Sequence, residues 1–262
     1  MTLIRFPATM RAGRGTQRTS PSLPWRERAT VEPPQRIGRA GMDKTKCSLL
    51  FLGKKDDSHT ARALEFCRMN LSDVSAHLGR WGDPMPQEIC TWEGDYIISY
   101  LSRWVVPEHV LNKARIAAIN FHPASPDYPG IGCNNFALYD NAQEYGTTCH
   151  HMTTAVDTGT IIKTRLFPVF PEDNVATLLA RTYDEQLILF YEIADLIKNE
   201  KELPISDEQW TRKPFTRTEF NKLSKITPDM GKEEIARRIR ATSFGTWKPT
   251  VELHGFVFEL KA

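Results

Sequence analysis

IAAINFHPASPDYPGIGCNNFALYDNAQEYGTTCHHMTTAVDTGTII, residues 116–162, is the stretch that decides the fold. It opens with a short apolar run that gives way to Asn120 and His122, which is how a buried strand reaches its carboxyl end. A second β-rich segment, residues 145–151, precedes a loop that holds Asp157. In an open α/β sheet, ligands bind beyond the carboxyl ends of the strands, so we expect the amide, the imidazole and the carboxylate to meet there.

Apolar runs and helical patterns alternate around this stretch. Residues 47–53 predict a buried first strand, and Ser58 is the expected N-cap of the helix after it. Residues 96–101 predict another strand, and Pro107 opens a short helix. An apolar stripe over residues 174–199 predicts the longest helix, packed on the sheet. This alternation predicts an α/β fold with a Rossmann-like, mostly parallel sheet and helices on both faces.

The pattern changes after residue 202. Residues 231–240 predict a charged helix, and residues 249–260 predict two short strands that turn near His254 and Gly255. This part is too small for an independent barrel. We therefore expect a catalytic domain over residues 42–202 and a small C-terminal helix and β-hairpin appendage over residues 203–262, which serves substrate binding or dimerisation.

Residues 1–41 differ from the rest in composition. They contain eight Arg, two Glu, five Pro and no Lys, so their own formal net charge is +6. Because the whole chain has a formal net charge of +2, residues 42–262 carry −4. Without a hydrophobic period they predict a disordered extension. An arginine-rich leader can target an organelle or bind polyanions, but we favour an extension upstream of a true start at Met42.

Composition and charge exclude several classes of protein. A mildly acidic body argues against a nucleic-acid partner, because binding to a phosphate backbone depends on Lys and Arg. Five scattered cysteines without a CxxC pair argue against a disulfide framework or structural zinc and favour a reducing cytoplasm. No apolar run approaches the roughly 20 residues of a membrane-spanning helix, so no membrane partner is expected.

Asn120 and His122 are the first candidates for chemistry. They lie two residues apart on a strand and share a face, and Pro123 restricts the backbone of His122 to extended conformations. An amide donor beside an imidazole is what acyl transfer requires, since one stabilises an oxyanion and the other moves a proton. Asp157 could orient the imidazole, as in nucleophilic triads. The alternatives are a structural histidine and a simple turn aspartate.

Two further observations limit the chemistry. No Ser or Cys stands in a nucleophile frame such as GxSxG, so the substrate is expected to bring the nucleophile. His150 and His151 invite a metal interpretation, but adjacent strand residues face opposite sides and no further ligand stands at a suitable spacing. We therefore predict no metal, with one of these histidines packed and the other exposed.

The segments NFHPASPDYPGIGCNNFAL and DTGTII together resemble the 10-formyltetrahydrofolate-dependent formyltransferase family. The family pattern of Asn-x-His-Pro, a Pro- and Gly-containing loop, a helix, a Thr-rich strand and Asp-x-Gly is matched from about residue 47 to about residue 199. Its Asn, His and Asp correspond to Asn120, His122 and Asp157. The resemblance implies an N-formyltransferase that uses 10-formyltetrahydrofolate as co-substrate, with these three residues as catalytic groups.

The acceptor is suggested by a second resemblance. Residues 240–260 resemble the carboxyl-terminal segment of the sugar N-formyltransferases of O-antigen synthesis, and the whole chain looks most like the GDP-perosamine N-formyltransferases. This implies formyl transfer to the 4-amine of a nucleotide-linked amino sugar in lipopolysaccharide synthesis, by a homodimer. It also implies folate binding at Ser102, Arg103, Trp104 and Val106. Candidates for holding the base or phosphate of the nucleotide sugar are Arg240, Phe244 and Trp247.

Alternatives to this acceptor remain open from the residues alone. The acceptor could be another dTDP- or UDP-linked amino sugar, or methionyl-tRNA. The chain could hydrolyse formyltetrahydrofolate, or it could bind a ligand without catalysis. Trp104 could be an ordinary core aromatic, and Arg240, Phe244 and Trp247 could simply pack or pair within the appendage.

Overall fold

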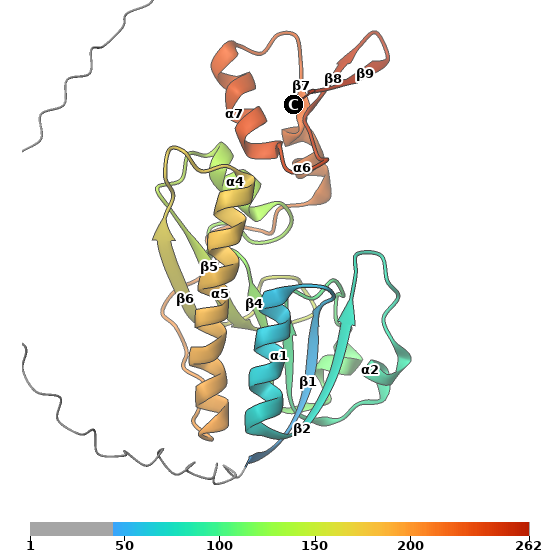
Figure 1. Cartoon of the computed structure of the whole chain (residues 1–262), viewed down its shortest axis with the longest axis vertical. Helices are drawn as coiled ribbons and strands as arrows, with labels where there is room; N and C mark the ends of the chain where they lie inside the picture. The colour runs from blue at the N-terminus through green and yellow to red at the C-terminus, as the bar shows by residue number, and fades with distance from the viewer. Residues whose placement is uncertain (1–43, 262) are drawn as a thin grey trace, which may run out of the picture. The chain divides into compact units, whose positions relative to one another are not determined.

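A computed structural model of the chain describes residues 44–261. The expected extension over residues 1–41 and the start at Met42 lie outside the described residues. Figure 1 shows a central sheet flanked by helices, with the carboxyl-terminal elements gathered next to α4. Among residues 44–261, no helix combines the length and apolarity that a membrane crossing requires.

The central sheet has six strands in the order β2-β1-β3-β4-β5-β6. These are β1 (Thr45–Lys54), β2 (Leu71–Gly79), β3 (Gly94–Tyr100), β4 (Ala114–His122), β5 (Glu144–His151) and β6 (Ile161–Pro168). Pairing is parallel from β2 to β4 and antiparallel for β5 and β6. The connecting helices are α1 (Ser58–Asn70), α2 (Gln87–Thr91), α3 (Glu108–Leu111), α4 (Cys133–Tyr139) and α5 (Val175–Lys198). The predicted α/β fold with a mostly parallel sheet is confirmed.

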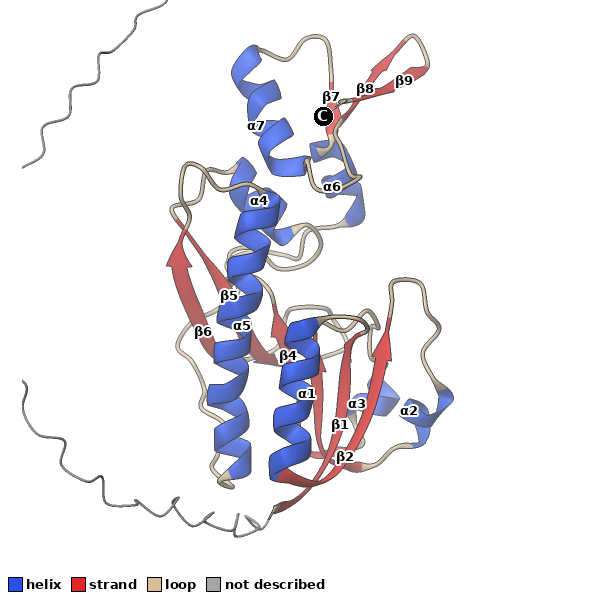
Figure 2. Cartoon of the chain, viewed as in Figure 1, coloured by secondary structure: helices blue, strands red, loops and turns tan. Residues whose placement is uncertain are grey.

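Both faces of the sheet are covered, which explains the continuous apolar run of β1. Leu49 and Phe51 pack on the side of α1 and α5, while Leu50 and Leu52 pack with Ile89 of α2 on the other side. Parallel strands buried on both faces carry such runs instead of an alternating pattern. Figure 2 shows α1 and α5 along the same side of the strands.

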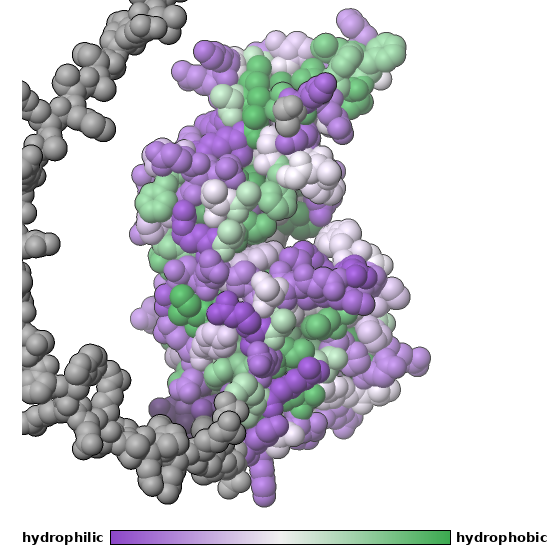
Figure 3. Space-filling view, in the orientation of Figure 1, coloured by the Kyte–Doolittle hydropathy of each residue, from purple (hydrophilic) through white to green (hydrophobic). Residues whose placement is uncertain are grey.

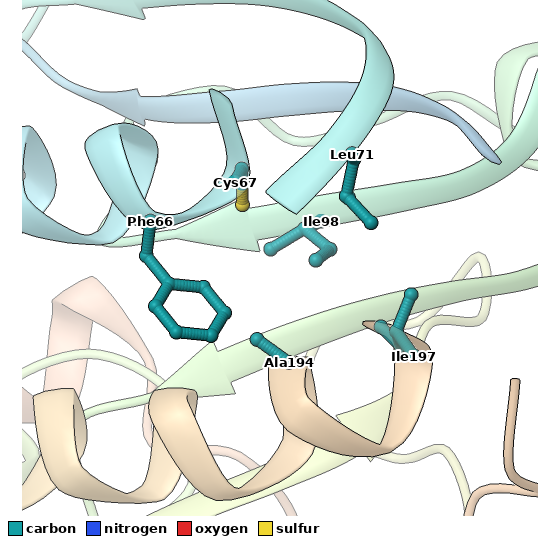
Figure 4. A pocket seen from close by; sticks show the side chains of 6 residues that line it. All are labelled: Phe66, Cys67, Leu71, Ile98, Ala194 and Ile197. Atoms are coloured by element: carbon teal, nitrogen blue, oxygen red, sulfur yellow. The ribbon is translucent and has the colours of Figure 1, made fainter. Parts of the chain in front are cut away.

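A small hollow remains between these two helices and the sheet. It is lined by Phe66, Cys67, Leu71, Ile98, Ala194 and Ile197 (Figure 4). Its lining is apolar, so it belongs to the core. A larger hollow of about 710 Å³ lies at the amino ends of β1, β3 and β4, beside Asp95 and Ile116. Neither hollow is lined by Asn120, His122 or Asp157.

The helix caps refine the predicted starts of α5 and α1. The side chain of Asn174, predicted as part of the helix over residues 174–199, instead caps α5 and accepts hydrogen bonds from the N–H groups of Ala176 and Thr177. Ser58 is not the cap of α1, because the side chain of Asp57 accepts from the N–H of Thr60 at 2.9 Å. A carboxylate one residue earlier takes the cap and leaves Ser58 as the first helical residue.

The carboxyl-terminal part forms a second, smaller assembly. It contains α6 (Arg217–Leu223), β7 (Lys225–Ile226), α7 (Lys232–Thr242), β8 (Thr250–Leu253) and β9 (Phe256–Glu259), with the sheet order β7-β8-β9. The predicted hairpin is confirmed, and its turn uses positive φ at His254 and Gly255. Asn135 of α4 donates to the carbonyl oxygen of Ala241 at 2.6 Å, which ties α7 to α4. The domain boundary at residues 202 and 203 stays a prediction.

The direction of β5 corrects one expectation. Ile119 pairs with His151 and His122 with Thr148, so β5 runs against β4 and ends beside Ile119, short of the carboxyl end of β4. The expectation that Asp157 follows a strand end at the same edge as His122 is therefore wrong. The loop between β5 and β6 instead brings Asp157 back to His122.

Candidate active site

Asn120, His122 and Asp157 lie together on one face of the sheet. β4 carries Asn120 and His122 two residues apart, and the loop after β5 brings Oδ2 of Asp157 to 3.3 Å from Nδ1 of His122. His122 is 5% exposed and Asp157 4%, whereas Asn120 is half-buried. An amide, an imidazole and a carboxylate thus meet at the end of β4.

Two glycines hold the carboxylate of Asp157 in place. The N–H of Gly130 donates to Oδ2 of Asp157 at 2.8 Å, so the loop after β4 clamps the loop after β5. Asp157 itself has φ of 49°, a left-handed conformation that Asp tolerates better than most residues. A Cβ added at Gly159 would lie 1.8 Å from the carbonyl oxygen of His151, so the turn requires glycine there.

His150 belongs to the same cluster, although the sequence analysis considered it only as a metal ligand and did not predict its place beside Asn120 and Asp157. Its Nε2 lies 3.1 Å from Nδ2 of Asn120 and 3.4 Å from Oδ1 of Asp157. Its Nδ1 lies 2.8 Å from the carbonyl oxygen of His151, which can only accept, so Nδ1 carries a hydrogen. In the neutral ring Nε2 then accepts from the amide of Asn120. Strand alternation allowed only one of the two adjacent histidines to face the site, but the pairing with Asn120 that selects His150 could not be read from the sequence.

The contacts of His122 compete for its protons. Nε2 lies 3.2 Å from the carbonyl oxygen of Tyr128, so this nitrogen donates, and Nδ1 faces the carboxylate of Asp157. A neutral ring carries one hydrogen and can donate to only one of these two oxygens. If an N–H group took the place of the Tyr128 carbonyl, Nε2 of His122 would accept from it. The single hydrogen of the neutral ring would then be on Nδ1 and would point to Asp157.

Burial and charge act in opposite directions on this pair. Burial lowers the pKa of His122, the charge of Asp157 raises it, and His150 lowers it further, so the pKa lies below its ordinary value. For Asp157, burial alone would raise the pKa, but His122, His150 and the N–H of Gly130 together hold it below its ordinary value. Near neutral pH the carboxylate is therefore ionised and the imidazole of His122 can accept a proton.

The segment predicted to bind folate adjoins this cluster. Ser99 pairs with Asn120, so the residues directly after β3 lie beside the end of β4. Leu101 has φ of 54°, which is uncommon for a leucine and marks a sharp turn of the backbone there. Val106 is buried and Arg103 is exposed. No contact in the described residues tests the folate role, which stays a prediction.

Trp104 is held by its own neighbours. Its indole N–H donates to the carbonyl oxygen of Asp83 at 2.9 Å, and its backbone N–H donates to Oγ of Ser102 at 3.2 Å. Its ring leaves no room for a side chain at Gly79, where an added Cβ would lie 2.3 Å from Cζ2. This packing agrees with the alternative that Trp104 is an ordinary core aromatic. The residue nevertheless lies in the loop that follows the carboxyl end of β3.

The three candidates for nucleotide binding contact one another or the loops beside α4 and α5; they are Arg240, Phe244 and Trp247. Arg240 donates to the carbonyl oxygens of Asp173 and Phe170 and to Oδ1 of Asn141. Phe244 and Trp247 exchange backbone hydrogen bonds of 2.9 and 2.8 Å, and both rings remain exposed. Arg240 therefore pairs with residues 141–173, outside the expected appendage, while Phe244 and Trp247 keep faces that a ligand could cover.

A metal site was not expected at the two adjacent histidines. Within residues 44–261, no group of three or more His, Cys, Asp or Glu side chains is arranged to hold a metal ion. His150 is buried in the cluster and His151 is half-buried.

Comparison with known proteins finds a family match over part of the chain. Residues 83–193 match the family described as formyl transferase, which confirms the resemblance drawn from the sequence. A methionyl-tRNA formyltransferase from Dictyoglomus turgidum is 31% identical over 144 residues, which cover 53% of this chain and 44% of that protein. One from Listeria monocytogenes is 30% identical over 93 residues and is covered over 30% of its length. The chain thus spans less than half of these curated relatives.

Solved structures share the fold more completely. A sugar N-formyltransferase from a Shewanella species has a TM-score of 0.67 at 16% identity, covering 82% of this chain and 97% of that one. A 4-N formyltransferase from Francisella tularensis has a TM-score of 0.65 at 18% identity over the same shares. An N-formyltransferase from Helicobacter canadensis, in complex with folinic acid and dTDP-3-aminofucose, has a TM-score of 0.61 at 20% identity and covers 74% and 80%. At these identities the likeness establishes the fold.

Proposed function

We propose that this chain, whose residues 83–193 match the formyl transferase family, transfers the formyl group of 10-formyltetrahydrofolate to the amine of a nucleotide-linked sugar. The observation that carries the proposal is the meeting of Asn120, His122 and Asp157 within this fold. The more specific proposal is the 4-amine of GDP-perosamine, in lipopolysaccharide O-antigen synthesis. Five free cysteines in the described residues are consistent with a reducing, cytoplasmic setting.

The end of β3 and β4 suits a folate co-substrate. Asn120 and His122 provide a donor and a proton acceptor, and the turn at Leu101 aims the backbone of residues 102–106 along the same edge. Backbone strain of this kind is often retained at binding sites. We propose that Ser102, Arg103, Trp104 and Val106 hold the pterin there. The co-substrate supplies an electrophilic formyl carbon.

The chain's own residues would carry the transfer as follows. Asn120 donates one N–H to His150 and directs its other N–H to the oxyanion that forms when the amine attacks. His122 accepts the proton of the attacking amine at Nε2, which releases the Tyr128 carbonyl, while Nδ1–H points to Asp157. Asp157 stabilises the resulting imidazolium, which then protonates the departing nitrogen.

The nucleotide would bind on the carboxyl-terminal side. Phe244 and Trp247 offer exposed rings for stacking on a base. Arg240 keeps their segment in place through its hydrogen bonds to the loops beside α4 and α5. A structure of similar fold holds dTDP-3-aminofucose together with folinic acid, which supports a nucleotide sugar as the class of acceptor.

A homodimer through the β8–β9 hairpin is part of the proposal. Phe256, Val257 and Phe258 are 70%, 64% and 55% exposed, on both faces of a two-stranded ribbon. Figure 3 shows this apolar surface over the hairpin. An exposed apolar edge strand pairs readily with another strand, and a second copy offers the same surface.

The test is mass spectrometry of the acceptor after incubation with 10-formyltetrahydrofolate. GDP-perosamine should gain one formyl group, and the His122→Asn variant should leave it unchanged. Parallel reactions with dTDP- and UDP-linked amino sugars and with methionyl-tRNA test the other acceptors. Tetrahydrofolate release without any acceptor would indicate a hydrolase. Failure of every amino sugar would overturn the proposal.

A further inference from the structure

Trp210 lies in the segment between α5 and α6, which crosses the candidate active site. Backbone hydrogen bonds fix this segment at both ends. The N–H of Ser206 donates to the carbonyl oxygen of Ile161 at 2.9 Å, and the N–H of Phe215 donates to that of Pro129 at 2.9 Å. The segment therefore runs from the start of β6 to the loop after β4, over the loop that carries the site's carboxylate.

The indole of Trp210 contacts three parts of the site at once. Its ring centroid lies 5.9 Å from that of His122 at an interplanar angle of 68°, and 5.1 Å from that of His150 at 88°. Both are edge-to-face contacts, which aromatic pairs prefer. The indole N–H donates to the carbonyl oxygen of Gly159 at 2.8 Å, two residues after Asp157. One side chain thus covers both imidazoles and anchors the turn beside the carboxylate.

An apolar ring in this place changes how the charges of the site act. The groups that face His122 are Asp157 from the loop after β5 and His150 from β5. Water beside the imidazole would screen these charges and stabilise the protonated ring, and Trp210 occupies that space. Burial is the largest cause that lowers the pKa of His122, and the indole is part of it.

We propose that Trp210 is a positioning residue for the transfer reaction, which keeps His122 out of water and holds the Asp157 turn against it. The inference rests on the proposed role of His122 as proton acceptor. Trp210 lies outside residues 83–193, so the formyl transferase match does not include it. The carboxyl-terminal part of the chain thereby completes the site that the central sheet begins.

Three variants test this role in the full chain. Trp210→Ala removes both the cover and the anchor and should lower kcat about 10²-fold, as expected for catalytic groups displaced by about 1 Å. Trp210→Phe keeps a ring but loses the N–H donor and should lower kcat about fivefold, the usual worth of one neutral hydrogen bond. Trp81→Phe is the matched control, because Trp81 is 72% exposed and contacts Arg217 instead of the site. KM for donor and acceptor should change little in all three.

The pH dependence separates positioning from mere stability. In Trp210→Ala, water reaches the imidazole, so the pKa of His122 rises and the acid limb of the kcat/KM profile moves to higher pH. Trp210→Phe and Trp81→Phe should keep the wild-type limb. An NMR titration of His122 in the free protein, assigned with His122→Asn, should show the same displacement without any substrate. Trp210→Leu replaces Trp210→Ala if the latter fails to fold.

The outcomes are distinct for the two proposals. If Trp210→Ala keeps the wild-type titration of His122 and the wild-type kcat, the positioning role is wrong. If it loses activity while the titration and the acid limb stay in place, the role is structural only, and the inference is again wrong. If the wild type formylates no amino sugar but His122 titrates at higher pH in Trp210→Ala, the proposed function fails and the covering role stands.

Discussion

Asp157→Asn tests the most critical contact of the site. The substitution removes one charge and little else, since Asn also tolerates the φ of 49° at this position and its amide oxygen can still accept from the N–H of Gly130. The folded structure should therefore persist. What is lost is the attraction between a carboxylate and the imidazolium that forms at His122 in the proposed reaction, with 3.3 Å between Oδ2 and Nδ1.

The size of the effect follows from that separation. At an effective dielectric constant of about 20, two unit charges 3.3 Å apart attract each other by about 5 kcal/mol. If the full attraction is realised only in the transition state, its loss lowers kcat about 4 × 10³-fold. The same replacement in a Ser-His-Asp triad lowers kcat about 10⁴-fold, which is the same order.

The assay is release of tetrahydrofolate with saturating acceptor, accompanied by a thermal melt to establish folding. Asp127→Asn is the matched control, because Asp127 is exposed in the loop after β4. The pH profile of kcat/KM also gives a direction for the change in the pKa of His122. Without Asp157 the protonated form of His122 loses its stabilisation, its pKa falls, and the acid limb should move to lower pH. A folded Asp157→Asn protein with more than about one tenth of the wild-type kcat, a barrier change under about 1.4 kcal/mol, would refute the reasoning.

Three further substitutions have defined outcomes. Gly159→Ala should lower kcat about 10²-fold and lower Tm, because its Cβ would lie 1.8 Å from the His151 carbonyl oxygen, whereas Gly231→Ala, with open space around the added Cβ, should change neither. Burial lowers the pKa of His122, so the unfolded chain binds its proton at higher pH. As the pH is lowered from about 6.5, the free energy of unfolding should therefore decrease, and this group contributes at most about 1.36 kcal/mol per pH unit to the decrease. In urea melts, His122→Asn should show a smaller decrease than His109→Asn, the control at an exposed histidine. Phe256→Lys should convert the proposed dimer to a monomer on size exclusion, while Ile205→Lys, at an exposed site outside the hairpin, should leave that dimer intact.

The sequence was sufficient wherever a local pattern has one structural solution. The apolar run of β1, closed by a glycine, predicted a buried strand, and the apolar stripe of α5 predicted an amphipathic helix that packs on the sheet. The hairpin turn at His254 and Gly255 is likewise local. A capping box of Thr216 and Glu219 begins α6, and it is an equally local signal in the sequence.

What could not be read from the sequence depends on the third dimension. Alternation along β5 is the same whether the strand runs with or against β4, so its direction, and with it the path of the Asp157 loop, stayed hidden. The pairing that brings His150 to Asn120 depends on that direction. Trp210 reaches the site from 53 residues beyond Asp157, and no periodic pattern marks it.

The pKa of His122 depends on two opposing influences that come from different loops, and a double variant can separate them. Asp157 favours the protonated ring, whereas the burial to which Trp210 contributes favours the neutral one. In Trp210→Ala/Asp157→Asn the two changes act on the pKa of His122 with opposite signs, so the acid limb of kcat/KM should return towards its wild-type position. The loss in kcat should nevertheless be smaller than the product of the two single losses, because water that enters beside the ring also screens the Asp157 charge that the second substitution removes. If the two losses in kcat multiply, as they do for independent sites, Trp210 does not act through the His122–Asp157 pair.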